Sequence, residues 1–194
     1  MDTVTLAWQG PYEWFGSGPD SVFSGSSAET AGIYVWTVPL GAEYRVFYIG
    51  QTEQGFAARH HDHFREYWGG AYSFYEPAAF SKGELGQWYT GYASKTPRWR
   101  LAAPFHADLL RYAEPLVEHL KAMRLWIAEC PQPARIQRRI ESAMKDLLCA
   151  RQDAIGSFLQ PGLIGQRRWE DEEPVLVRQV PADLIQGIPE EFEA

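Results

Sequence analysis

The sequence predicts a single α+β domain spanning residues 1–194, and three observations lead to this prediction. Two short runs, GIYVWTV (32–38) and YRVFYIG (44–50), are rich in β-branched and aromatic residues, which is typical of a β-hairpin. Residues with large side chains then recur at helical spacing over 56–67. A third strand-like run, RLWIAEC (124–130), lies between two further helical patterns, so strands and helices both build the fold.

Length and composition exclude several other classes. The chain has 194 residues, 45% of them apolar, and no apolar run approaches the roughly 20 residues that cross a bilayer. No basic stretch with an apolar core follows Met1, so we expect no secretory signal and a cytoplasmic location. Cys130 and Cys149 are too few for a disulfide framework, and we expect reduced thiols that fill small buried spaces.

The net charge of −7 is unevenly distributed. Residues 135–168 hold seven basic and three acidic residues, whereas the segment 169–194 is strongly acidic. The basic residues of the first segment either form a solvated helix face or contact an anionic partner such as nucleic acid.

The elements can be justified in order along the chain. Residues 1–31 are expected to pack on the core with one short strand at 4–8. In the hairpin, pairing Val38 with Tyr44 across a five-residue loop places Tyr34 directly opposite Tyr48 on one face. The glycines that begin and end this hairpin, Gly32 and Gly50, are either plain strand ends or points of close approach.

After the helix at 56–67, residues 69–104 form an insertion without helical periodicity, with turns and a strand near 87–92. A helix follows over 105–120 despite Pro115, and then the strand at 124–130. The next helix has an apolar stripe with Glu141 at its border; its members are Ile136, Ile140, Ala143, Met144 and Leu147. A last strand is expected at 175–180, followed by a frayed acidic end.

Common catalytic motifs are missing from the sequence. The cluster HHDH at 60–63 has no cysteine nearby, and adjacent residues on a helix point apart, so a structural zinc site is disfavoured. There is no phosphate-binding glycine loop and no Gly-x-Ser-x-Gly motif. The hairpin and the helix after it are therefore the best candidates for chemistry.

The hairpin carries the tripeptides GIY at 32–34 and YIG at 48–50. Arg59 follows nine residues after the second tripeptide, His63 lies one helical turn further, and Glu141 is the acid on the later helix. This combination resembles the GIY-YIG nuclease family over residues 32 to about 153. The resemblance implies a small, mainly antiparallel sheet of about three core strands flanked by helices. The segment 69–104 is then an insertion, and the acidic segment of about 169–194 an extension.

The resemblance also implies a metal-dependent endonuclease with one active site per chain, acting on DNA, with RNA left open. Its site residues would be Tyr34, Tyr48, Arg59, His63 and Glu141, with Mg²⁺ or Mn²⁺ held by Glu141. Arg59 would stabilise the charge that builds on the phosphorus. Tyr34 assisted by His63 is the favoured base, with His63 itself as the competing candidate. The chain acts as a monomer or a homodimer.

One departure from the family pattern matters. Family members commonly carry an asparagine about a dozen residues after the metal-binding glutamate, and this chain has no asparagine. Asp153, Gln152 or Gln160 is expected to replace it. The alternative function is a nucleic-acid or protein binding module of the same fold with weakened cleavage.

We expect nucleic-acid contacts from two places. In the insertion, aromatic residues alternate with positive charge, including Arg98 and Arg100. The later helix offers Arg135, Arg138 and Arg139. The insertion is alternatively a hydrophobic cover over the sheet.

Overall fold

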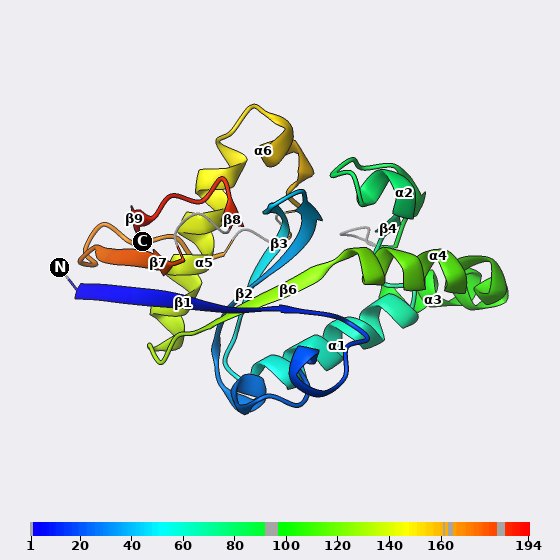
Figure 1. Cartoon of the computed structure of the whole chain (residues 1–194), viewed down its shortest axis with the longest axis horizontal. Coiled ribbons are helices and arrows are strands. Elements are labelled where there is room, and N and C mark those ends of the chain that lie inside the picture. The colour runs from blue at the N-terminus through cyan, green and yellow to red at the C-terminus, as the bar shows by residue number, and fades with distance from the viewer. Residues whose placement is uncertain (1, 92–96, 161, 163–164, 182–184) are drawn as a thin grey trace.

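The protein is built around a seven-stranded mixed sheet with strand order β8-β3-β2-β6-β1-β7-β9 (Figure 1). The computed structural model describes residues 2–91, 97–160, 162, 165–181 and 185–194. Strand β1 pairs in parallel with β7, and β3 in parallel with β8, while the other neighbours are antiparallel. The expectation of a small, mainly antiparallel sheet of about three core strands is therefore wrong, because both ends of the chain add strands to it.

Strand β1 (Asp2–Tyr12) lies inside the sheet, between β6 (Arg124–Glu129) and β7 (Val175–Val180). Its side chains alternate between buried and exposed, and Val4, Leu6 and Trp8 face the core. The sequence predicted only a short strand at 4–8 in a segment packed on the core. The strand is longer because it pairs with partners on both sides, which periodicity within one segment cannot show.

Strands β2 (Gly32–Leu40) and β3 (Glu43–Thr52) form the predicted hairpin, but with a different register. The turn is shorter than expected, with Gly41 in the left-handed region (φ 67°). A β-bulge also shifts the pairing between Trp36 and Thr37, so Tyr48 pairs with Trp36 and Tyr34 pairs with Gly50. Tyr34 and Tyr48 still share one face, with ring centroids 6.1 Å apart.

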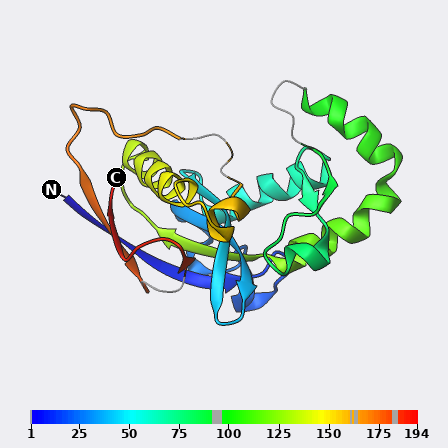
Figure 2. The same ribbon diagram turned by 90° about the horizontal axis from the view of Figure 1, so that it is seen from above.

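Both faces of the sheet are covered by helices (Figure 2). On one face, α5 (Ala134–Cys149) and α6 (Ala154–Phe158) pack against β1, β2 and β3. On the other face lie α1 (Phe56–Trp68) and α4 (Leu109–Ala122). In the predicted stripe on α5, Ile140 and Met144 are buried and Ile136 and Ala143 are partly buried. Leu147 is exposed, and Leu148 faces the core in its place.

The insertion has more regular structure than predicted. Strands β4 (Phe74–Tyr75) and β5 (Gln87–Tyr89) form a small second sheet, joined through α2 (Pro77–Phe80). Helix α3 (Arg98–Ala107) ends next to Asp108, where α4 begins, so the single helix expected over 105–120 is two helices. Pro115 is accommodated inside α4, as predicted.

Residues 185–194 pack on the sheet, and the prediction of a frayed end is wrong. Strands β8 (Ile185–Gln186) and β9 (Glu191–Glu193) join the sheet, and Phe192 and Ala194 are buried. Two short 3₁₀ helices, Gly18–Asp20 and Ser26–Glu29, lie between β1 and β2. Cys130 is buried as expected, but Cys149 is exposed.

None of the helices formed by the described residues combines the length and apolar character needed to cross a membrane.

His119 on α4 is a buried polar residue in an aromatic environment. Its ring packs against Phe80, with centroids 4.2 Å apart, and also contacts Tyr75 and Phe74. Among the described residues, neither ring nitrogen has a hydrogen-bond partner. Burial lowers the pKa of His119 to about 3, so this histidine is neutral in the folded protein.

We therefore predict that His119→Leu stabilises the protein. Removing two buried, unpaired nitrogens should raise the free energy of unfolding by about 1–3 kcal/mol at pH 7. The folded-state pKa of His119 is depressed, so below pH 6.5 the unfolded chain binds a proton that the folded chain does not. The gain should therefore grow as the pH falls from about 6.5, by up to about 1.4 kcal/mol per pH unit.

Urea unfolding at pH 7 and pH 5, followed by tryptophan fluorescence, measures this gain. His61→Leu, on the exposed side of α1, is the control and should show neither effect. A His119→Leu variant less stable than the native chain at both pH values would contradict the prediction.

Candidate active site

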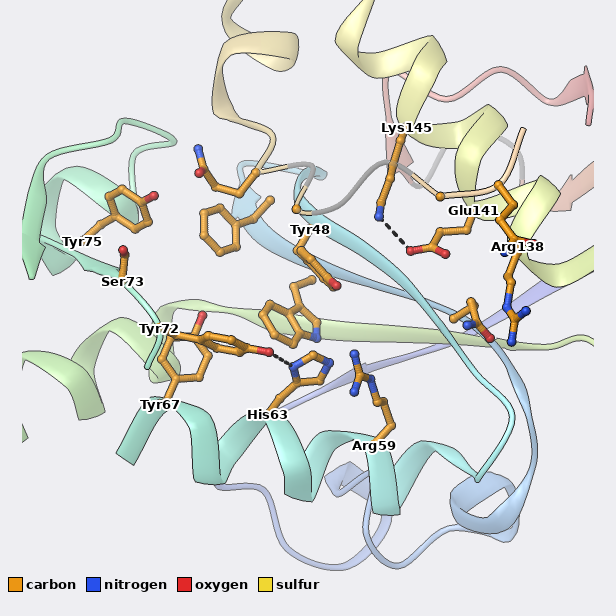
Figure 3. Close-up of a pocket in the computed structure, with 17 residues that line it drawn as sticks. Tyr48, Arg59, His63, Tyr67, Tyr72, Ser73, Tyr75, Arg138, Glu141 and Lys145 are labelled. Carbon is orange, nitrogen blue, oxygen red and sulfur yellow. Dashed lines mark hydrogen bonds and ion pairs between the residues drawn. The ribbon is translucent and has the colours of Figure 1, made fainter. Parts of the chain in front are cut away.

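A pocket of about 510 Å³ lies between α1, strand β3 and α5. Four of the residues expected at the site line it: Tyr48 from β3, Arg59 and His63 from α1, and Glu141 from α5. Figure 3 shows Arg59 and His63 rising from α1 toward Tyr48, with Glu141 facing them from α5. The fifth residue, Tyr34 on β2, is fully buried behind the pocket. The structure thus brings all five together.

The β-bulge explains how two neighbouring side chains of β3 can line this pocket. In a regular strand, neighbouring side chains point to opposite faces. Because the pairing shifts here, Phe47 and Tyr48 both line the pocket. The Phe47 carbonyl accepts a hydrogen bond from the Gln160 amide nitrogen at 2.7 Å, which ties the segment after α6 to the bulge.

Tyr34, Arg59, His63 and Tyr72 form one hydrogen-bonded chain. Arg59 Nε donates to the Tyr34 hydroxyl at 3.2 Å, and this hydroxyl lies 2.7 Å from His63 Nε2. The other ring nitrogen, Nδ1 of His63, lies 3.0 Å from the Tyr72 hydroxyl. One arrangement that satisfies all three contacts has Tyr34 donating to His63 Nε2 and His63 Nδ1–H donating to Tyr72.

Burial sets the protonation of this chain. It raises the pKa of Tyr34 well above its usual value, and it lowers the pKa of His63 well below its usual value. Burial also opposes the charge on Arg59, but the interactions with Tyr34 and Tyr48 outweigh this and raise the Arg59 pKa. At neutral pH the guanidinium group of Arg59 is therefore charged, whereas the phenol of Tyr34 and the imidazole of His63 are neutral.

Glycines 32 and 50 are points of close approach. A Cβ atom at Gly50 would overlap the phenol ring of Tyr34, and one at Gly32 would overlap the carbonyl oxygen of Ala128 on β6. Gly32 and Gly50 are therefore not plain strand ends, the other alternative that the sequence left open. Because Gly50 has no side chain, the Tyr34 ring can pack directly against the backbone of β3.

Glu141 on α5 is paired with a residue that the sequence analysis did not single out. Lys145, one helical turn further, donates from Nζ to Glu141 Oε1 at 2.7 Å. The Lys145 side chain is 2% exposed and that of Glu141 is 12% exposed. Lys145 Nζ also lies 5.6 Å from the centroid of the Tyr48 ring. The spacing of Glu141 and Lys145 could have predicted this pair.

These residues do not fit a preformed divalent-metal site. In the described ranges there is no group of three or more histidine, cysteine or acidic residues arranged to hold a metal ion. Glu141 is the carboxylate that lines the pocket, and one of its oxygens already accepts a hydrogen bond from an ammonium group. The expectation of Mg²⁺ or Mn²⁺ at Glu141 stays a prediction.

The arginines expected to contact nucleic acid have different environments. Arg138 lines the pocket and pairs with Glu53. Arg139 is 3% exposed and donates to the carbonyl oxygens of Glu173 and Ala194, a position that does not suit the predicted contact with nucleic acid.

Arg135 forms a two-pronged pair with Glu172 and stacks on Trp169, which uses its donors inside the protein. Arg100 on α3 is exposed. The side chain of Arg98 lies outside the described part of the structure. Arg100 and Arg138 are therefore the predicted contacts whose described positions suit this role.

The three residues expected to replace the missing asparagine also lie in different environments. Asp153 caps α6 and pairs with Arg151, and Gln152 is exposed, whereas Gln160 lines the pocket. Tyr72 belongs to the insertion, whose aromatic residues were expected to contact nucleic acid; its place at the pocket beside His63 was not predicted, because no periodicity marks the direction of its side chain.

The chain matches no protein-family model, no curated protein and no solved structure in comparisons with each.

We predict that Gly50→Ala destabilises the protein, because the added methyl group must displace the Tyr34 ring. The expected loss in free energy of unfolding is about 1–3 kcal/mol. Urea unfolding measures it, and Gly25→Ala is the matched control, since a Cβ atom there meets nothing closer than 4.0 Å. Equal stability of the two variants would show that the Tyr34 ring is not fixed against β3.

Proposed function

We propose that the protein is an endonuclease that hydrolyses phosphodiester bonds in DNA, with a site of the GIY-YIG type. The observation that supports this most is the convergence of Tyr34, Tyr48, Arg59, His63 and Glu141 around one pocket. These residues come from β2, β3, α1 and α5, and their order and spacing along the chain resemble those of this family.

The charge of the pocket suits a phosphodiester. Among its described lining residues are three cationic side chains, Arg59, Arg138 and Lys145, and one carboxylate, Glu141. The pocket is therefore net positive and attracts an anion. Arg59 is held in place by Tyr34, so its remaining donors can face a phosphoryl oxygen without losing side-chain entropy during the reaction.

Tyr48 is a better candidate for the base than Tyr34. Tyr34 is fully buried and already bonded to Arg59 and His63, so it cannot contact an attacking water in this arrangement. Tyr48 lines the pocket. Burial and then Glu141 raise the pKa of Tyr48 above its usual value, and Arg59 and a hydrogen bond with Tyr34 offset only part of this, so the Tyr48 phenol is protonated at neutral pH and must lose its proton before it can act as the base. Tyr34 and His63 then act as positioning residues, which replaces the expectation that Tyr34 removes the proton.

A nicking assay on supercoiled plasmid tests the proposal. Arg59→Ala should lower the nicking rate by about 100-fold or more, as expected when a fixed donor to the transition state is lost. Arg111→Ala is the control, because Arg111 is an exposed arginine on α4 that pairs with Asp108. Equal rates for native protein and Arg59→Ala would overturn the assignment.

The two tyrosines should respond differently in the same assay. We predict that Tyr48→Phe lowers the nicking rate by about 100-fold, because general-base catalysis contributes roughly this factor, and that it costs less stability than Tyr34→Phe, because Tyr48 borders the pocket. Tyr34→Phe should lower both the rate and, by about 1–3 kcal/mol, the free energy of unfolding, since it leaves buried partners unpaired. A larger rate loss in Tyr34→Phe at full stability would return the role of base to Tyr34.

A binding module without cleavage is the second candidate, and the absence of asparagine together with the Glu141–Lys145 pair favours it. It predicts DNA or RNA binding that Arg59→Ala weakens, with no strand cleavage of supercoiled, single-stranded or branched substrates.

A further inference from the structure

Lys145 is a buried lysine at the wall of a functional pocket. It reaches from α5 toward Glu141, as Figure 3 shows, and its side chain is almost fully removed from solvent. Burying an ammonium group is costly unless the group is paired and hydrogen-bonded. Glu141 provides that pairing at 2.7 Å, and the face of the Tyr48 ring lies on another side at 5.6 Å. Solvation at the protein surface therefore does not account for the ammonium charge of Lys145 at this position.

The position of the ammonium group bears on the metal expected at Glu141. A divalent ion bound by this carboxylate would lie next to the Lys145 charge and would be repelled by it. The pocket contributes no second carboxylate from its described residues to offset that repulsion. Lys145 therefore occupies one oxygen of the carboxylate that a metal would need, and it already supplies one positive charge at this place.

We propose that the ammonium charge of Lys145 takes the place of a divalent metal at this site, so that strand cleavage needs no divalent metal. This inference rests on the proposed nuclease function. Glu141 holds the ammonium group, and Arg59 faces it from α1 (Figure 3). A phosphodiester bound between these two cations would have its equatorial oxygens stabilised from two sides.

The chemical step is a simple hydrolysis. Water oxygen forms a bond to phosphorus while the bond from phosphorus to the leaving sugar oxygen breaks. One proton leaves the water and one is taken up by the leaving oxygen. No electrons are exchanged, and no co-reactant besides water is needed. Lys145 acts through its charge and stays protonated throughout.

The first test uses the native chain. Plasmid nicking is measured in excess EDTA and, separately, with Mg²⁺ or Mn²⁺. We expect the rate in EDTA to lie within about threefold of the rate with either metal, since the proposal assigns the metal no role. Nicking that occurs with metal, stops in EDTA and is lost in Arg59→Ala would overturn the role of Lys145 while leaving the nuclease function intact. No nicking under any condition would overturn both.

A matched pair of variants separates a catalytic lysine from a structural ion pair. Lys145→Met keeps the length of the side chain and removes the charge, and it should lower the EDTA nicking rate by about 100-fold. Lys121→Met is the control, because Lys121 forms a similar 2.7 Å pair with Glu118 on the exposed surface of α4. Full activity of folded Lys145→Met would overturn the proposal.

Metal binding provides a measurement that does not depend on activity. The native chain is titrated with Mn²⁺ and followed by electron paramagnetic resonance. It should have no Mn²⁺ site at Glu141, so Glu141→Gln should bind as much Mn²⁺ as the native chain. In contrast, Lys145→Met frees the carboxylate and should gain a Mn²⁺ site that Glu141→Gln abolishes. Mn²⁺ bound by the native chain and lost in Glu141→Gln would overturn the proposal, and this measurement stands even if Lys145→Met fails to fold.

Discussion

The pairing of β2 with β3, including its bulge, is the constraint on which the site depends. The bulge turns Phe47 and Tyr48 toward the same pocket, and the shifted register brings Gly50 under the Tyr34 ring. Tyr34 in turn holds Arg59 and His63. A hairpin with regular pairing would keep the same sequence motifs but direct Phe47 and Tyr48 to opposite faces. The geometry of the pocket thus follows from one irregularity in the sheet.

The sequence could predict the parts that depend on local pattern. The hairpin, the helix bearing Arg59 and His63, and the strands β6 and β7 lie where periodicity and β-propensity indicate. The five site residues were found through their joint order along the chain. Four of them converge because a helix directly after a hairpin packs back on the hairpin's face, whereas Glu141 comes from α5, which packs on the other face of the sheet.

The rest depends on contacts between distant segments, which local patterns do not encode. Strand β1 has its parallel partner β7 some 170 residues later, and the end of the chain supplies two more strands. Tyr72 reaches the site from an insertion without periodicity. Lys145 was visible as a neighbour of Glu141, but its burial depends on how α5 sits against β3. The register was missed because the turn is shorter than the predicted five-residue loop and because a bulge leaves no residue pattern of its own.

The position of β1 also affects the order in which the chain can fold. During synthesis its edge facing β7 has no partner until residues 175–180 have been made, although β6 is available earlier. Contacts of such long sequence separation raise the contact order and slow folding, and an unpaired strand edge exposes the nascent chain to association with other chains. The pairing of β1 with β7, which completes the sheet, therefore forms late. The hairpin and α1, which carry most of the site, depend on local contacts and can form first.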